Sequence, residues 1–172
     1  SLTLSFNDPH FLKSFTRLAV AYSDASDGST KYFSLDRPFY ALDTRWSAGT
    51  LLSDSDFDVD RWELGKRVGK FDTHAQYYQV NGGWSAGLRD GWVRRWTYGA
   101  TYQQSDFEPV TGAPLGGPLP ADRKFVYPWV GFELLQDSFQ ERRNQDQIRR
   151  TEDVLVGFNG WARLGFATES FG

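Results

Sequence analysis

The sequence predicts an all-β fold, an antiparallel up-and-down meander of about eight strands. Apolar and polar residues alternate with a period of two in segment after segment of the 172-residue chain, which is typical of strands with two unlike faces. Aromatic residues make up 17 % of the chain, and many recur on the apolar side of this alternation. We therefore expect a transmembrane β-barrel or part of a larger one. The mean hydropathy of −0.54 fits strands that are apolar on one face only.

The alternation is found in seven segments. Their apolar sets, in chain order, are Leu2, Leu4 and Phe6; Leu18, Val20 and Tyr22; Phe33 and Leu35; Trp62 and Leu64; Tyr78, Val80, Trp84 and Ala86; Trp96, Tyr98, Ala100 and Tyr102; and Val154, Val156, Phe158, Ala162, Leu164 and Phe166. No stretch approaches the ~18 consecutive apolar residues of a transmembrane helix.

Turn and loop signals separate the predicted strands. Residues 6–24 and 35–54 repeat one hairpin pattern, in which Pro9 and Pro38 each precede an aromatic residue within two positions. Asp90-Gly91 is a tight-turn pair. Residues 105–122 form the longest loop, rich in Pro and Gly, and residues 137–153 are expected to be a hairpin or a solvated loop rather than a helix. Residues 1–172 are expected to form a single domain.

Composition excludes several classes of protein. The absence of Cys rules out disulfides and thiolate sites, and two His residues cannot form a three-His zinc site. The net charge of −3 argues against nucleic acid as a partner. We expect no cofactor. Because the chain contains no Met and opens with Ser1, we expect a processed chain or a piece of a longer one.

The two faces of the predicted strands suit lipid and a barrel lumen. Aromatic rings near strand ends suit the membrane–water interface, which assigns this place to Tyr22, Trp46, Trp62, Trp84, Trp96 and Tyr102. The opposite face carries charges that would line the lumen, namely Arg17, Arg45, Arg61, Glu63, Arg95 and Arg163. Small residues on that face would leave room for the arginines. A soluble β-sandwich with an aromatic carbohydrate-binding face would show the same alternation.

Three segments near the N-terminus resemble a known family. Leu4-Ser-Phe-Asn-Asp-Pro-His-Phe-Leu12, followed by Leu18-Ala-Val-Ala-Tyr-Ser-Asp24, and Tyr32-Phe-Ser-Leu-Asp-Arg-Pro-Phe-Tyr40 resemble early barrel strands of the BamA/TamA-type bacterial surface antigens. In that family an Asp-Pro-aromatic turn recurs at the periplasmic side, usually with a following Gly that this chain replaces by Lys13-Ser14 and Leu42-Asp43. The family's lumenal Arg-Gly-aromatic signature is absent from this chain.

The resemblance implies an outer-membrane protein of bacteria. It implies a 16-stranded barrel preceded by periplasmic POTRA domains, of which 172 residues would hold about half the strands. It also implies a role in the insertion, assembly or translocation of other proteins. The expected partners are outer-membrane lipid and the POTRA domains or remaining barrel strands that this chain lacks.

Enzymatic and metal chemistry have weaker support in the sequence. A small outer-membrane esterase or deacylase would need His10 or His74 as its base, with Asp72 a possible orienting group for His74. Asp54, Asp56, Asp58 and Asp60 would project to one face of an extended chain, as calcium ligands do in some loops. Their spacing lacks the features of a calcium-binding loop, so a solvated extracellular loop is expected. We predict a non-catalytic protein without a metal site.

Overall fold

A computed structural model describes residues 1–143, 151–155 and 157–167. Eight strands form one antiparallel sheet: β1 (Leu2–Phe11), β2 (Thr16–Ala25), β3 (Gly28–Arg37), β4 (Trp46–Glu63), β5 (Lys66–Arg89), β6 (Trp92–Pro109), β7 (Arg123–Gln136) and β10 (Asn159–Gly165). Each strand pairs with the next in the chain, apart from β7, which pairs with β10. The predicted all-β meander of about eight strands is confirmed.

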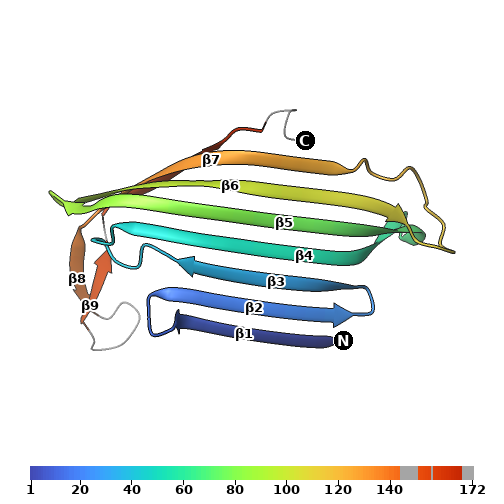
Figure 1. Cartoon of the computed structure of the whole chain (residues 1–172), viewed down its shortest axis with the longest axis horizontal. Helices are drawn as coiled ribbons and strands as arrows, with labels where there is room; N and C mark the ends of the chain where they lie inside the picture. The colour runs from blue at the N-terminus through green and yellow to red at the C-terminus, as the bar shows by residue number, and fades with distance from the viewer. Residues whose placement is uncertain (144–150, 156, 168–172) are drawn as a thin grey trace.

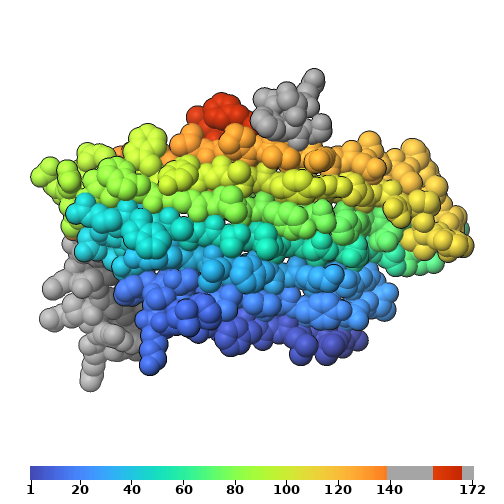
Figure 2. Space-filling model, in the orientation of Figure 1, coloured from blue at the N-terminus to red at the C-terminus, as the bar shows by residue number. Residues whose placement is uncertain are grey.

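The sheet is open, with β1 and β10 as its two edges (Figure 1). Within the described residues these edges do not meet, so the predicted closure into a barrel is not observed. The space-filling view shows the side chains of β1 to β7 forming one continuous surface (Figure 2). No helix in the described part of the chain is long and apolar enough to cross a membrane.

The central strands are unusually long. β4, β5 and β6 contain 18, 24 and 18 residues, whereas a strand needs only about 9–11 residues to cross a bilayer. The three strands stay paired to their far end, where Val59 of β4 and Pro109 of β6 both lie opposite Phe71 of β5. This three-stranded extension carries residues that the sequence predicts as loops.

Several predicted boundaries are therefore wrong. Asp54, Asp56, Asp58 and Asp60 lie in β4, and residues 105–109 lie in β6, which leaves 110–122 as the loop. Their backbone groups pair with residues 70–76 of β5, and a paired backbone outweighs the weak strand preference of Asp.

The N-terminal turn also differs from its prediction. Asp8 and Pro9 lie inside β1, with a register shift between Asp8 and Phe11. The turn itself covers residues 12–15, where Leu12 and Lys13 have φ angles of 55° and 57°. Pro9 is tolerated because β1 is an edge strand, where a missing N–H costs less.

The C-terminal alternating segment divides into two parts. β9 (Thr151–Leu155) pairs with β8 (Phe139–Arg143) in a separate two-stranded sheet. Of the two alternatives expected for residues 137–153, a hairpin or a solvated loop, this antiparallel pairing fits the hairpin. β10 begins only at Asn159, after Phe158 accepts a backbone hydrogen bond from Gln136. The single strand predicted over Val154–Phe166 is wrong. Val156 lies outside the described residues.

The buried core is small and lies on one face of the sheet. The cross-strand register and the alternation of side chains place Phe71, Val93, Trp129 and Leu135 on the face that also carries Arg95, here called the polar face. Residues 38–45 and 110–122 fold back over it, because Arg95 of the polar face donates to the Ala41 carbonyl and Arg61 of the same face donates to the carbonyls of Leu115 and Pro118. The opposite, apolar face keeps large hydrophobic side chains exposed.

Candidate functional site

Three tryptophans form a row across the apolar face near one end of the sheet. Trp46 lies opposite Trp84, Trp84 opposite Trp96, and Trp96 opposite Phe132. The tryptophans are 51 %, 56 % and 49 % exposed. The ring centroids of Trp96 and Phe132 are 4.7 Å apart. Four neighbouring strands thus present one continuous band of aromatic rings.

A second aromatic row lies further along the same strands. Tyr78 and Tyr102 are cross-strand partners, and their rings stack with centroids 5.5 Å apart. Tyr78 precedes Trp84 by six residues, a distance of about 20 Å along β5. Most residues between the rows, including Ala48, Val80, Ala100 and Val130, are apolar, and Thr50 is an exception whose hydroxyl donates to the Gln79 carbonyl. We call the apolar face from the Trp row to the Tyr row the apolar belt.

The belt continues over β3, β2 and β1, but runs diagonally to the hydrogen-bonded rows. On one side, the row partners of Asp54 on β2 and β1 are Tyr22 and Leu4, which are apolar or aromatic. On the other side, charged residues of the edge strands lie in line with apolar residues of β5. Arg37 of β3 lies in the row of Gly82, and Asp8 of β1 lies in the row of Val80. A belt of constant height requires this drift if the strands are tilted, as barrel strands are.

The polar face combines charge with covering loops. Arg95 is 8 % exposed, donates to Glu133 Oε2 at 3.0 Å and to the Ala41 carbonyl at 3.1 Å, and lies over the Phe39 ring. A Cβ at Gly83 would meet that same ring at 2.9 Å. Glycine at position 83 therefore lets the 38–45 loop pack on the sheet.

Trp129 is the polar-face residue that sequence reasoning missed. It lies between Gly99 and Gly165 on the adjacent strands and is 5 % exposed. A Cβ on Gly99 would clash with its ring, so this glycine makes room for tryptophan rather than arginine. The Arg163 guanidinium lies 3.9 Å from the ring centroid. The paired glycines are the sequence signal that such a ring needs space.

Five of the six predicted interface aromatics lie in the belt or at its limit. Trp46, Trp84 and Trp96 form the Trp row, Tyr102 belongs to the Tyr row, and Tyr22 lies at the limit on β2. Trp62 does not join them. It lies next to the β4–β5 turn opposite Arg67, ten residues beyond Leu52, or about 33 Å along the strand.

The predicted lumen charges are more scattered. Arg17, Arg61, Arg95 and Arg163 lie on the polar face, with Arg17 opposite Asp36 and Arg61 donating to the carbonyls of Leu115 and Pro118. Arg45 belongs to the covering loop and donates to the Ala86 carbonyl. Glu63 is exposed beside the β4–β5 turn. These six charges therefore do not form one cluster.

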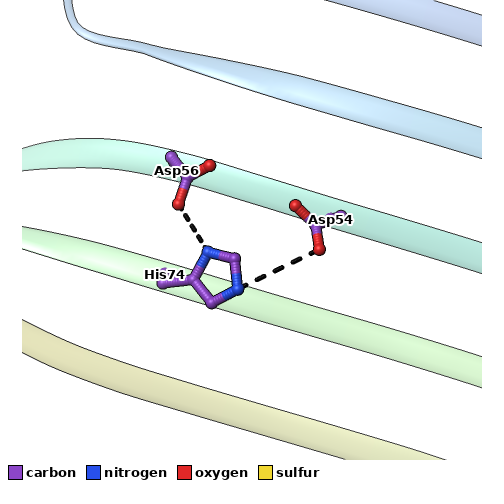
Figure 3. Close-up of side chains that lie close together, drawn as sticks. All are labelled: Asp54, Asp56 and His74. Carbon is purple, nitrogen blue, oxygen red and sulfur yellow. Dashed lines mark hydrogen bonds and ion pairs between the residues drawn. The ribbon is translucent and has the colours of Figure 1, made fainter.

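A histidine between two carboxylates lies beyond the belt on the apolar face (Figure 3). His74 of β5 is directly opposite Asp56 of β4, with 2.5 Å between Nδ1 and Oδ1. Nε2 faces Asp54 Oδ2 at 4.0 Å. Asp72, the predicted partner, instead accepts from the Thr73 amide. His74 pairs with Asp56 rather than with Asp72, because side chains directly opposite each other on adjacent strands lie closest together.

The charges around His74 raise its pKa above the usual 6.5. The largest cause is the hydrogen bond to Asp56, which partial burial opposes, and the negative charges of Asp56, Asp54 and Asp106 add to the rise. Asp106 is the partner of His74 on β6. Gln76 Nε2 and the Tyr78 hydroxyl both donate to Asp54 Oδ2, at 3.1 and 3.4 Å.

Comparisons with protein-family models, with curated proteins and with solved structures find no match for this chain.

Proposed function

We propose that this chain is part of the membrane-spanning wall of a bacterial outer-membrane β-barrel. The barrel is non-catalytic and acts in the insertion, assembly or translocation of other proteins. The apolar belt is the observation that carries the membrane part of this proposal. The role in handling proteins rests on the resemblance of residues 4–40 to the BamA/TamA-type family.

The composition of the belt supports contact with lipid. An aromatic row lies at each margin of its apolar residues, and the lipid-facing band of a transmembrane β-barrel has aromatic residues at both margins. Beyond the Tyr row the same face becomes polar at once, with Asp54, Gln76 and Gln104 in one row. Beyond the Trp row stands Arg94, two residues from Trp96.

The open edges support a need for further strands. β1 and β10 each present a backbone that is unpaired on one side within the described residues. Such edges are unfavourable in lipid, where backbone groups find no water. The remaining strands of a larger barrel would satisfy them, which agrees with a 16-stranded barrel.

The exposed tryptophans also favour one alternative, a carbohydrate-binding module. Aromatic rings in a row can stack on sugar rings. A sandwich would cover one face of the large sheet with a second sheet, but the described residues place eight strands in one sheet and only two in another. The non-catalytic assignment is supported at His74, where the groups facing both ring nitrogens are carboxylates rather than a serine.

The first experiment is folding of the purified chain in buffer, in detergent and in lipid vesicles. We expect β structure by circular dichroism and a heat-dependent shift in gel migration only with detergent or lipid. A monodisperse β-rich monomer in plain buffer would contradict the membrane proposal. Binding of that soluble form to a glycan array would then favour the carbohydrate-binding alternative.

A second experiment addresses the role in assembly. Vesicles carrying the folded chain should speed the insertion of an unfolded outer-membrane barrel, read by protease protection, over empty vesicles. The control is an equal amount of an unrelated small barrel. Equal rates with both barrels would remove the assembly role and leave the membrane proposal standing.

A further inference from the structure

We propose that His74 and Asp54 bind a divalent cation of the zinc and nickel class, with Asp56 as the group that orients the imidazole. The ligand-bearing atoms of the three residues lie within 4.8 Å of one another. They come from two adjacent strands on the apolar face, beyond the Tyr row. This site is independent of the proposed function.

The imidazole orientation is the first observation for this site. An ionised carboxylate only accepts hydrogen bonds, so His74 Nδ1 donates its hydrogen to Asp56 Oδ1 at 2.5 Å. In the neutral ring that bond places the free electron pair on Nε2. Metal-binding histidines commonly show this arrangement, in which a carboxylate fixes the tautomer and makes the other nitrogen a better ligand.

The gap between His74 and Asp54 is the second observation. Nε2 lies 4.0 Å from Asp54 Oδ2, which is too long for a hydrogen bond. One zinc–nitrogen and one zinc–oxygen bond laid end to end reach roughly 4.2 Å. At 4.0 Å an ion can contact both atoms, but with an N–metal–O angle wider than tetrahedral. An approach of the two atoms by roughly half an ångström would give the tetrahedral angle. Figure 3 shows the ring lying between the two carboxylates, with one nitrogen facing each.

The neighbours of Asp54 hold its carboxylate in place. Gln76 Nε2 and the Tyr78 hydroxyl donate to Oδ2 at 3.1 and 3.4 Å, and hydrogen-bonded carboxylates are usual among metal ligands. Because a carboxylate oxygen has two lone pairs, an ion at Oδ2 would replace the longer bond, from Tyr78, while Gln76 continues to hold the carboxylate. Asp54 and His74 are about one quarter and one third exposed, so water can complete the coordination. An imidazole ligand favours zinc or nickel over calcium and magnesium, which prefer oxygen ligands alone.

Two further acidic residues near the site have other partners. Asp106, opposite His74 on β6, accepts a hydrogen bond from Gln104 Nε2 at 2.6 Å. Asp58 is two residues beyond Asp56 on the same face, but its carboxylate is bound to Lys70 Nζ at 2.5 Å. It is therefore a matched control. A diffuse acidic surface would bind cations through Asp58 as well as through Asp54, whereas the proposed site would not.

The test is titration of the folded full chain with ZnSO4 in detergent micelles, followed by calorimetry and by NMR of 15N-labelled histidine. We expect one saturable site, with the shift largest at His74 Nε2. His74→Gln and Asp54→Asn should remove it. Asp56→Asn should weaken it roughly 10- to 100-fold. Asp58→Asn and His10→Gln should leave the affinity unchanged.

Three results would overturn the site. One is zinc binding that survives His74→Gln, the second is an equal effect of Asp58→Asn and Asp54→Asn, and the third is calcium binding as tight as zinc. Circular dichroism of each variant separates loss of the ligand from loss of the fold. A chain that folds in plain buffer would contradict the membrane proposal without affecting this test, which is then run without detergent.

Discussion

His74 shows what decides a partnership at the scale of single residues. In the sequence its nearest acidic neighbour on the same strand face is Asp72, two positions away. In the sheet its closest partner is Asp56, eighteen positions away, because the register places the two directly opposite. A one-residue slip would turn one of the two to the other face. The sequence therefore identifies His74 as a titratable group, but register selects its partner.

The titration of His74 should depend on Asp56. In the metal-free protein the pKa of His74 is raised above 6.5, mainly by this hydrogen bond. The linked stabilisation is thus fully present below pH 6.5 and is lost as pH rises through the folded-state pKa. We expect Asp56→Asn to lower the midpoint of the His74 titration by NMR in EDTA. The chain has two histidines, so the signal that remains in the His10→Gln variant belongs to His74. An unchanged midpoint would mean that the hydrogen bond does not form in solution.

At the scale of elements, the hairpin turns set how neighbouring strands align. The β5–β6 turn has Asp90 and Gly91 at φ angles of 52° and 76°, the residue pair expected for a two-residue turn with two positive φ angles. The β4–β5 turn has Leu64 and Gly65 at 45° and 77°. A positive φ angle is sterically unfavourable for leucine, and the Leu64 side chain is 98 % exposed, so packing does not compensate. The turn at residues 64–65 is thus formed against local preference.

Leu64→Asn should stabilise the β4–β5 hairpin. Asparagine tolerates positive φ better than leucine, and Asn-Gly is a favoured pair for this turn. We expect the free energy of unfolding to rise by about 1 kcal/mol, measured by urea unfolding of the chain folded in detergent or lipid. The reverse change, Asp90→Leu at the matching turn, should lower it by a similar amount. No change in either variant would indicate that the turns do not share this geometry.

At the scale of the whole molecule, the sheet has two faces with different surroundings. The apolar face carries the apolar belt across its strands and leaves large hydrophobic side chains exposed. The polar face is covered in part by residues 38–45 and 110–122. Barrel walls have this asymmetry, because one face meets lipid and the other meets the lumen. The small buried core lies on the polar face, opposite these exposed hydrophobic side chains.

The two faces should respond differently to a buried charge. Val80 is 58 % exposed between the aromatic rows, so Val80→Arg should destabilise the membrane-folded form by ~2–4 kcal/mol. The side chain of the next residue, Asn81, lies on the polar face and lines a hollow of about 350 Å³ together with Asp36. Asn81→Arg should therefore destabilise the protein much less than Val80→Arg. The measurement is urea unfolding from lipid vesicles. Equal costs would argue against lipid at the apolar face.

The alternation of apolar and polar residues was sufficient to predict β-strands, their antiparallel order along the chain and the two unlike faces of the sheet. Period-two alternation specifies these directly, since adjacent side chains point to opposite sides of a strand. Pattern failed for the acidic run from Asp54 to Asp60 and for Ser105 to Pro109, which read as loops but pair along β5. Their strand state comes from hydrogen bonds to a neighbour that local composition does not report.

Contacts between distant segments depended on the tertiary structure. Trp129 between two glycines, Arg95 beneath the 38–45 loop and the His74 cluster each bring together residues from separate strands. The diagonal course of the belt also appears only when eight strands are placed in register. Side-chain alternation is a local property with a fixed period. Register and loop packing are long-range properties set by the pairing of whole strands, and local sequence does not contain them.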